Sequence, residues 1–457
     1  MESEIVHSKL NMASYGCGKA LNEFFSMAFG ATAFYFYEAA LGLDSLFAGI
    51  GFMIYAVWNS INDPIIGYFT NRPFKFTRKW GRRFPWMLIG GIPWIFCYYL
   101  IFVPPSTAQL AMFFWLIFTT CLFDGFGSFW FVNFMSLFPD KFRGVRERRT
   151  ASGIATPIGI LGIASGAILP SLFYQYEHPA TFVIAAGVVV IGAIILFGLS
   201  IPGSRDEKVY VDRYLTSYEE NPNRQPFFTM LVKTLKHKNF LVFIITYLLY
   251  QFLVASMIAS IPYVNNFLLG QEASATTMIM AGFLIGALIS IFFWIRAAQK
   301  TNKNKNVLVV AGYYLAAMTL VLFFVRDYWI MVMLLIIWGG GLGGFWAIYP
   351  PTFAETIDEA VLMFQSREEG IYNGIFQFFG RFSTALQAIS FSVVHMLTGF
   401  AEGSETQTAE AVFGIQIHFA LIPAIAMFIG VTVLLLFYDL TPEKIEGIKI
   451  RIKELGL

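Results

Sequence analysis

The chain has 457 residues, of which 57% are hydrophobic and only 13% are charged, and its mean hydropathy is +0.63. A soluble domain carries about 25% charged residues, so this chain has too few to cover a globular surface. The net charge of +2 gives no sign of a nucleic-acid partner, and none is expected. The composition indicates an all-α membrane protein.

Apolar runs that cross the ~30 Å hydrocarbon core of a bilayer need about 20 residues. Twelve are predicted, at residues 20–42, 45–70, 85–104, 107–137, 151–175, 179–201, 239–268, 273–298, 306–325, 328–352, 370–398 and 412–438. Most Lys and Arg residues then lie on the side that holds both ends of the chain. The positive-inside rule therefore predicts cytoplasmic termini, and we expect a multi-pass protein of the plasma (cell) membrane.

The longest polar stretch divides the twelve predicted spans six and six. We expect an N-terminal six-helix bundle at 1–201 and a cytoplasmic central linker at 202–238. A C-terminal six-helix bundle at 239–440 and a cytoplasmic tail at 441–457 follow.

The two halves share short motifs in the same order. Gly125-Phe126-Gly127-Ser128-Phe129-Trp130 matches Gly341-Leu342-Gly343-Gly344-Phe345-Trp346, Phe138-Pro139-Asp140 parallels Phe353-Ala354-Glu355, and Arg146-Glu147 matches Arg367-Glu368. The matches indicate duplication of a six-span unit; chance similarity between glycine-rich helices is the alternative. Carriers of the major-facilitator type have such halves and bind substrate between them, so we predict the major facilitator fold.

Asp63 is an acidic residue inside the second apolar run. An ionised side chain at membrane depth costs about 2.5–3.5 kcal/mol, and such residues mark routes for ions or solutes. Asn59 lies one turn earlier on the same helix face, and Asn62 is adjacent. A carboxylate with amide oxygens suits Na⁺, or a proton on the carboxylate itself. The alternative is a structural ion pair with the basic loop that follows.

Other polar residues also fall inside predicted spans. Asp124 and Arg381 lie at mid-depth, where Arg381 should face Asp63, Asp124 or an anionic group of a substrate, or form a structural salt bridge. Glu23 begins the first span and could instead be interfacial. The lone His395 and His418 are each expected to bond a neighbouring helix, and neither is assigned to proton transfer.

Three aromatic side chains lie in the repeated glycine-rich spans: Trp130, Trp346 and Tyr349. A flat ring there could stack on the face of a sugar, and core packing is the alternative. The sequence has no Walker loop, no dinucleotide fingerprint, no His/Cys metal spacing and no Gly-x-Ser-x-Gly elbow. We therefore expect no enzyme and no cofactor, and transport that runs on a gradient.

Several motifs resemble those of the glycoside–pentoside–hexuronide cation symporters, the melibiose-carrier type, within the major facilitator superfamily. They are Ser14-Tyr15-Gly16-Cys17-Gly18, Trp58-x-x-Ile61-Asn62-Asp63-Pro64-Ile65-Ile66-Gly67, Gly81-Arg82-Arg83-Phe84-Pro85-Trp86, Arg146-Glu147-Arg148 and Arg367-Glu368-Glu369-Gly370. The resemblance covers nearly the whole chain. It implies that cytoplasmic-loop arginines take part in conformational gating: Arg82, Arg83, Arg146, Arg148 and Arg367.

The resemblance also implies a cation site. In that family, two acids and an asparagine on span two join a hydroxyl on span four, and the matching positions are Asn59, Asn62, Asp63 and Cys121. Asn59 and Cys121 depart from the pattern, so Na⁺ at Asp63 should bind weakly. Proton coupling through Asp63, or no coupling, is then favoured.

The sugar-binding acids of that family are similar to Glu23 and Asp124, and its functional lysine falls at Arg381, which cannot easily lose a proton. Its stacking tryptophan follows the acid by four residues, whereas Trp130 follows Asp124 by six. We therefore expect a secondary active transporter: a cation-coupled symporter of a sugar, glycoside or related polar solute, working by alternating access as a monomer. The alternatives are a carrier of lysolipids or other amphiphiles, or a membrane receptor or scaffold that transports nothing.

Overall fold

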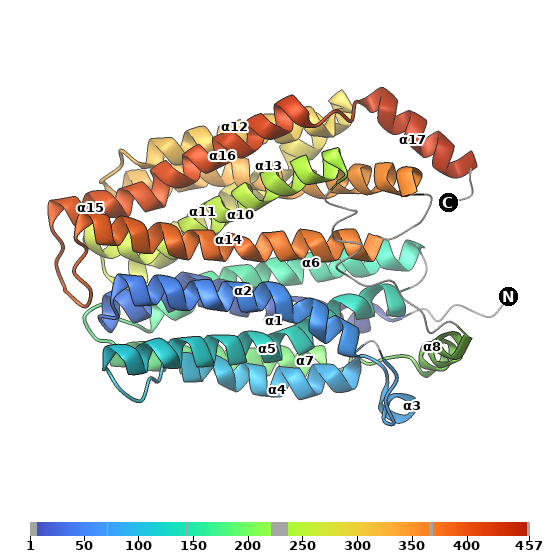
Figure 1. Cartoon of the computed structure of the whole chain (residues 1–457), viewed down its shortest axis with the longest axis horizontal. Helices are drawn as coiled ribbons and strands as arrows, with labels where there is room; N and C mark the ends of the chain where they lie inside the picture. The colour runs from blue at the N-terminus through green and yellow to red at the C-terminus, as the bar shows by residue number, and fades with distance from the viewer. Residues whose placement is uncertain (1–6, 71, 143–144, 221–235, 365–368, 455–457) are drawn as a thin grey trace. The chain divides into compact units, whose positions relative to one another are not determined.

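The computed structural model describes residues 7–70, 72–142, 145–220, 236–364 and 369–454 (Figure 1). Within these ranges the regular elements are helices, apart from one isolated β-bridge between Gln175 and His178. The chain divides into two compact units. Unit 1 comprises Met1–Arg224 with Glu402–Glu405, and unit 2 comprises Gln225–Ala401 with Thr406–Leu457.

The first unit is built from six long helices and several short ones. In chain order they are α1 (Lys9–Tyr35), the π-helical η1 (Phe36–Ala40), α2 (Ser45–Thr70), α3 (Thr77–Trp80), α4 (Phe84–Ile101), α5 (Gln109–Lys141), α6 (Val145–Ile168), η2 (Pro170–Leu172), α7 (Ala180–Ser200) and α8 (Lys208–Glu220). Helix α1 packs on α6 and α7, α4 packs on α5 and α7, and α2 packs on α5. Figure 1 shows the long helices of this unit running side by side.

The second unit repeats this construction. Its helices are α10 (Lys238–Tyr263), the π-helical η3 (Val264–Leu268), η4 (Ala273–Ala275), α11 (Thr276–Thr301), α12 (Asn304–Leu322), α13 (Tyr328–Phe364), α14 (Glu369–Thr398), α15 (Ala409–Gln416), the π-helical η5 (Ile417–Leu421), α16 (Ile422–Phe437) and α17 (Pro442–Glu454). Helix α13 packs on α11 and α12, and α10 packs on α14 and α16.

Nine helical stretches in the described part of the chain are long and apolar enough to cross a membrane. They lie at 84–101, 109–141, 147–172, 180–200, 238–268, 273–301, 304–322, 328–363 and 409–437. Helices α1, α2 and α14 also coincide with predicted spans but are not among the nine. Their polar residues, which include Glu23, Asp63 and Arg381, lower their hydropathy.

Glycine lets helices of the first unit approach closely. A Cβ atom at Gly162 or Gly166 of α6 would collide with the backbone of Ala20 or Phe24 on α1. Lipid tails are as apolar as leucine, so membrane helices gain stability from such close van der Waals packing. The glycines of α6 therefore fix how α1, which carries Glu23, lies in this unit.

The tenth predicted span is longer than expected. It was placed at residues 328–352, whereas α13 continues through Pro350 and Pro351 to Phe364. Polar contacts of Glu355 and Glu359 stabilise the extension, which a search for apolar runs does not detect. Parts of the predicted linker and of the predicted tail are also helical, as α8 and α17.

Candidate functional site

Three polar side chains of α2 and α5 form a buried cluster, called here the α2–α5 cluster: Asn62, Asp124 and Ser128. The amide Nδ2 of Asn62 donates to Oδ2 of Asp124 at 2.5 Å. The hydroxyl of Ser128 donates to Oδ1 of Asn62 at 2.9 Å. The amide therefore uses both its donor and its acceptor to join a carboxylate and a hydroxyl inside the unit.

The other predicted cation-site residues are close in sequence to members of this cluster. Asp63, which follows Asn62, is half-buried on α2, and Cys121, one turn before Asp124 on α5, is also half-buried. Asn59 is half-buried one turn before Asp63, and its Nδ2 donates to the hydroxyl of Tyr55 at 3.4 Å. The hydroxyl that bonds Asn62 belongs to Ser128, a residue that the sequence reasoning did not single out for this role.

Glu23 lies half-buried on α1, one turn after Lys19. The ammonium group of Lys19 reaches the hydroxyl of Thr156 on α6 at 3.5 Å. Thr156 also borders an open surface depression of about 660 Å³ within the first unit, lined by Phe138, Arg148, Arg149, Ser152, Gly153, Thr156 and Pro157. This depression adjoins the α1–α6 contact, and two arginines and two hydroxyl side chains are among its lining residues.

The aromatic candidates differ in their surroundings. Trp130 is only 2% exposed, and its ring packs against Trp94, Phe134 and Phe197. These contacts are typical of a side chain in the core. Stacking of the Trp130 ring on a sugar stays a prediction.

In the second unit, Trp346 and Tyr349 are half-buried on α13. The ring of Tyr349 lies 5.6 Å from that of Tyr247 and 5.9 Å from that of Phe376, measured between centroids. Arg381 is half-buried on α14. Because Arg381 belongs to unit 2 whereas Asp63 and Asp124 belong to unit 1, the predicted pairing between them stays a prediction.

The first two predicted gating arginines converge on one carboxylate. Asp140, near the end of α5, lies 3.4 Å from Nη1 of Arg82 and 3.4 Å from Nε of Arg83. The guanidinium of Arg82 also lies 3.7 Å from the ring centre of Tyr214 on α8. Burial lowers the pKa of Arg83, and the neighbouring Asp140 opposes that shift. The contacts tie the loop before α4 to α5 and α8.

The start of α4 is held by Asp206. Its Oδ2 accepts hydrogen bonds from the backbone N–H groups of Arg83 and Phe84, both at 2.9 Å. The first N–H groups of a helix have no intrahelical partner, so a carboxylate there stabilises the helix start. Burial raises the pKa of Asp206, and the two backbone hydrogen bonds oppose that shift.

The remaining predicted gating residues are described only in part. Arg148 is exposed, and its guanidinium donates to the backbone carbonyl groups of Phe142 at 2.6 Å and Pro139 at 3.2 Å. Arg367 and the side chain of Arg146 lie outside the described residues.

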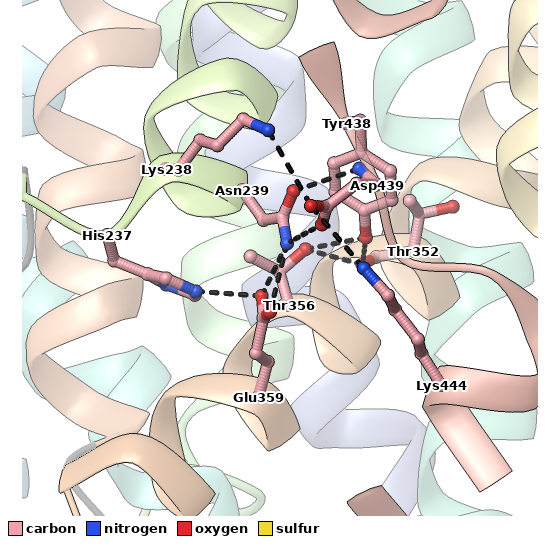
Figure 2. A network of polar contacts seen from close by, with 9 residues as sticks. All are labelled: His237, Lys238, Asn239, Thr352, Thr356, Glu359, Tyr438, Asp439 and Lys444. Atoms are coloured by element: carbon pink, nitrogen blue, oxygen red, sulfur yellow. Dashed lines mark hydrogen bonds and ion pairs between the residues drawn. The ribbon is translucent and has the colours of Figure 1, made fainter. Parts of the chain in front are cut away.

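A polar network at the end of α13 was not anticipated from the sequence, and Figure 2 shows it. Nε2 of His237 lies 2.7 Å from Oε2 of Glu359. The amide of Asn239 donates to Glu359 at 2.8 Å and to Asp439 at 2.7 Å. Lys238 and Lys444 lie 3.6 and 3.4 Å from Asp439. This network, the α13 network, joins the start of α10 to α13 and to the junction of α16 and α17.

Matched residues of the two halves make matched contacts. Asp140, near the end of α5, bonds the arginines that precede α4. Its counterpart Glu355 accepts a 2.6 Å hydrogen bond from Asn304, the first residue of α12. The equivalent places of these carboxylates support the interpretation of the chain as a duplicated unit.

A family described as MFS/sugar transport protein matches residues 14–442 of this chain. The sodium-dependent lysophosphatidylcholine symporter 1-A of Danio rerio is 31% identical over 124 residues, which are 27% of this chain. The aligned part is 23% of that relative's length. The uncharacterized symporter YjmB of Bacillus subtilis is 22% identical over 457 residues, covering 97% of this chain and 95% of the relative.

Among solved structures, a mutant of the nucleoside transporter NupG superposes with a TM-score of 0.64 and 14% sequence identity. The superposition covers 94% of this chain and 99% of that structure. At this identity the likeness shows the fold alone.

Proposed function

From the premise that this chain belongs to the MFS/sugar transport protein family, we propose that it is a cation-coupled symporter of a polar organic solute. The α2–α5 cluster beside Asp63 is the observation that carries this proposal. An intramembrane carboxylate joined to an amide and a hydroxyl is the kind of site that binds a hard cation or a proton.

The proposed coupling residues divide into two groups. Asp124 and Asn62 form the buried, mutually bonded part, while Asp63 and Asn59 are half-buried on α2. A half-buried carboxylate next to a fixed amide can gain or lose a cation without breaking the cluster itself. We therefore assign cation binding to Asp63 and Asn59, with the α2–α5 cluster holding α2 against α5; Cys121 lies at the edge of this region.

For the solute, a sugar or glycoside is the first candidate. Acidic side chains suit sugar hydroxyls, and half-buried aromatic rings suit a sugar face. The acidic candidates are Glu23 and Asp124, and the aromatic candidates are Trp346 and Tyr349. Arg381 is a basic candidate that can donate hydrogen bonds to sugar hydroxyls. The proposal includes twelve spans, cytoplasmic termini, a plasma-membrane location and alternating access by a monomer. We also propose that, within its family, the chain is a carrier of the melibiose type.

A second candidate solute is a lysolipid. The relative from Danio rerio bears the name of a lysophosphatidylcholine symporter, and the present chain contains 50 phenylalanines. A carrier of this class would move lysophosphatidylcholine in a reaction with which sugars do not compete.

Purified protein in liposomes tests the proposal. Labelled sugars, glycosides and lysophosphatidylcholine are offered with a Na⁺ gradient, a pH gradient or neither. We expect gradient-driven accumulation of one solute class, lost in Asp63→Asn while solute exchange persists. Asp212→Asn, which neutralises an exposed carboxylate on α8, is the matched control and should transport like the wild type. Unchanged accumulation in Asp63→Asn would make Asp63 structural.

A further inference from the structure

Two histidines of the second unit bond directly to each other. Nε2 of His395 on α14 lies 3.0 Å from Nε2 of His418 on η5. Nδ1 of His418 lies 2.9 Å from the hydroxyl of Ser260 on α10. Both imidazoles are 0% exposed. The sequence placed them in different spans and predicted a bond from each to a neighbouring helix; the structure shows that each is the other's partner.

The Nε2–Nε2 contact restricts the number of protons that the pair can hold. A neutral imidazole has one protonated and one unprotonated nitrogen. At 3.0 Å, one Nε2 must donate and the other must accept. Ser260 can donate to His418 or accept from it, so either direction of the chain is satisfied. In both cases one Nε2 lone pair remains the acceptor within the pair.

Aromatic rings surround the two imidazoles. The ring of Phe400 stacks on His395 at a centroid distance of 4.2 Å, and that of Phe391 lies 4.0 Å from His418. Tyr263 lies 5.3 Å from His395 and 5.8 Å from His418. Aromatic faces attract cations, so this cage can accommodate an imidazolium better than an aliphatic one would.

We propose that His395 and His418 form a proton-binding site within the second unit, separate from the residues proposed for cation coupling in the first. A proton from water binds the accepting Nε2 lone pair and converts that ring to an imidazolium. The contact persists if this imidazolium donates its Nε2–H to the other ring, whose own proton then lies on Nδ1. A further proton makes two N–H groups face each other, opens the contact and loosens α14 from η5.

The local backbone fits such a role. His418 lies in the π-helical η5, and Ser260 lies four residues before the π-helical η3. Single π-helical turns within α-helices occur frequently at functional sites. Among the residues that the structure describes, two further titratable or charged groups lie near this region. One is Tyr263 of α10, and the other is Arg326, whose guanidinium reaches Gln416 at 3.4 Å, two residues before His418.

The test is ¹⁵N NMR of the full chain, labelled at histidine and held in lipid nanodiscs, between about pH 8 and pH 5, where histidine changes charge. The chain has five histidines, so single His→Gln variants assign the signals. At the alkaline end we expect one protonated and one unprotonated Nε2 in the pair. On acidification a second proton should bind and both rings should change together.

Coupling between the rings is the decisive result. In His395→Gln, the titration midpoint of His418 should move by about one pH unit or more, about a tenfold change in proton affinity. His178→Gln, which removes an exposed histidine of the first unit, should leave the pair unchanged. Rings that stay neutral over the whole range, or that titrate independently, would overturn the proposal. The wild-type spectra decide the first point even if a variant does not fold. The experiment measures proton binding directly, so it does not depend on which solute, if any, the protein moves.

Discussion

A single amide organises the polar interior of the first unit. Asn62 donates to Asp124 and accepts from Ser128, so it bridges two positions of α5 that lie one turn apart. An aspartate in its place could not donate, and an aliphatic residue could do neither. The identity of this one side chain therefore decides whether these two hydrogen bonds join α2 to α5.

Asn62→Ala should destabilise the protein by about 1–3 kcal/mol, because it removes a donor from a buried carboxylate and the acceptor of Ser128. Thermal unfolding in detergent measures the loss. In the same experiment, Na⁺ or acid should stabilise the variant less than the wild type, because Asn62 holds the helix that carries Asp63 and weaker binding of a ligand gives less stabilisation. The control is Asn11→Ala, which removes the hydrogen bond that the side-chain amide of Asn11 donates to the backbone carbonyl of Pro202 elsewhere in the unit. If Na⁺ or acid raised the Tm of Asn62→Ala as much as that of Asn11→Ala, Asn62 would have no part in cation binding.

Part of this cluster could be predicted from the sequence. Asp124, Asn62 and Asp63 stand out because polar side chains inside apolar runs are costly. Their contact could not be predicted, because it depends on the rotation and register of α2 against α5. Ser128 gives a still weaker signal: a hydroxyl in such a helix usually bonds its own backbone, as Thr119 and Thr120 do here.

At the level of elements, helix ends are held by carboxylates from neighbouring segments. Asp206 accepts the first N–H groups of α4, and Asp439 joins the start of α10 to α17. These contacts could not be predicted from the sequence, since each acid lies in a polar stretch among other charged residues. Only the folded chain brings Asp439 to Asn239, 200 residues away.

The pH response of α17 follows from Asp439. The hydrogen bond from Asn239 lowers the pKa of Asp439; burial opposes this shift, and Lys444 and Lys238 add to the lowering. A carboxyl group whose pKa is lower in the folded state stabilises that state above its unfolded pKa, about 3.9, and the contribution is lost as the pH falls through the folded pKa. Acidification below about pH 4 should therefore weaken the attachment of α17.

Asp439→Ala should produce the same effect at neutral pH. Hydrogen exchange of the α17 amides should become up to about fivefold faster, the change expected for a half-exposed ion pair of about 1 kcal/mol. Glu446→Ala, on an exposed position of α17, should leave the exchange as in the wild type. If both variants exchange alike, the α13 network does not hold α17 (Figure 2).

At the level of the whole molecule, the two units share some local features, although the glutamates that their histidines contact lie on helices that are not counterparts, α6 and α13. A π-helical segment follows the first long helix of each, η1 after α1 and η3 after α10. A histidine precedes each of these helices and contacts a glutamate: His7 with Glu147 at 2.8 Å, and His237 with Glu359 at 2.7 Å. The short repeats in the sequence pointed to this duplication, while the π-helical segments left no pattern that periodicity could detect.

Charge distribution predicts which ends of the helices face the cytoplasm, and labelling of single cysteines can test it. Cys17, Cys97 and Cys121 are free thiols and would first be replaced. A cysteine at the exposed Thr216 of α8 or Glu446 of α17 should react with a membrane-impermeant maleimide only after the cells are permeabilised. Glu177→Cys, at an exposed position between α6 and α7, should react in intact cells. The positive-inside rule requires this pattern, because lysine and arginine are retained on the cytoplasmic side. Reaction of all three positions in intact cells would contradict the twelve-span topology. It would also contradict a carrier whose two halves have the same orientation in the membrane.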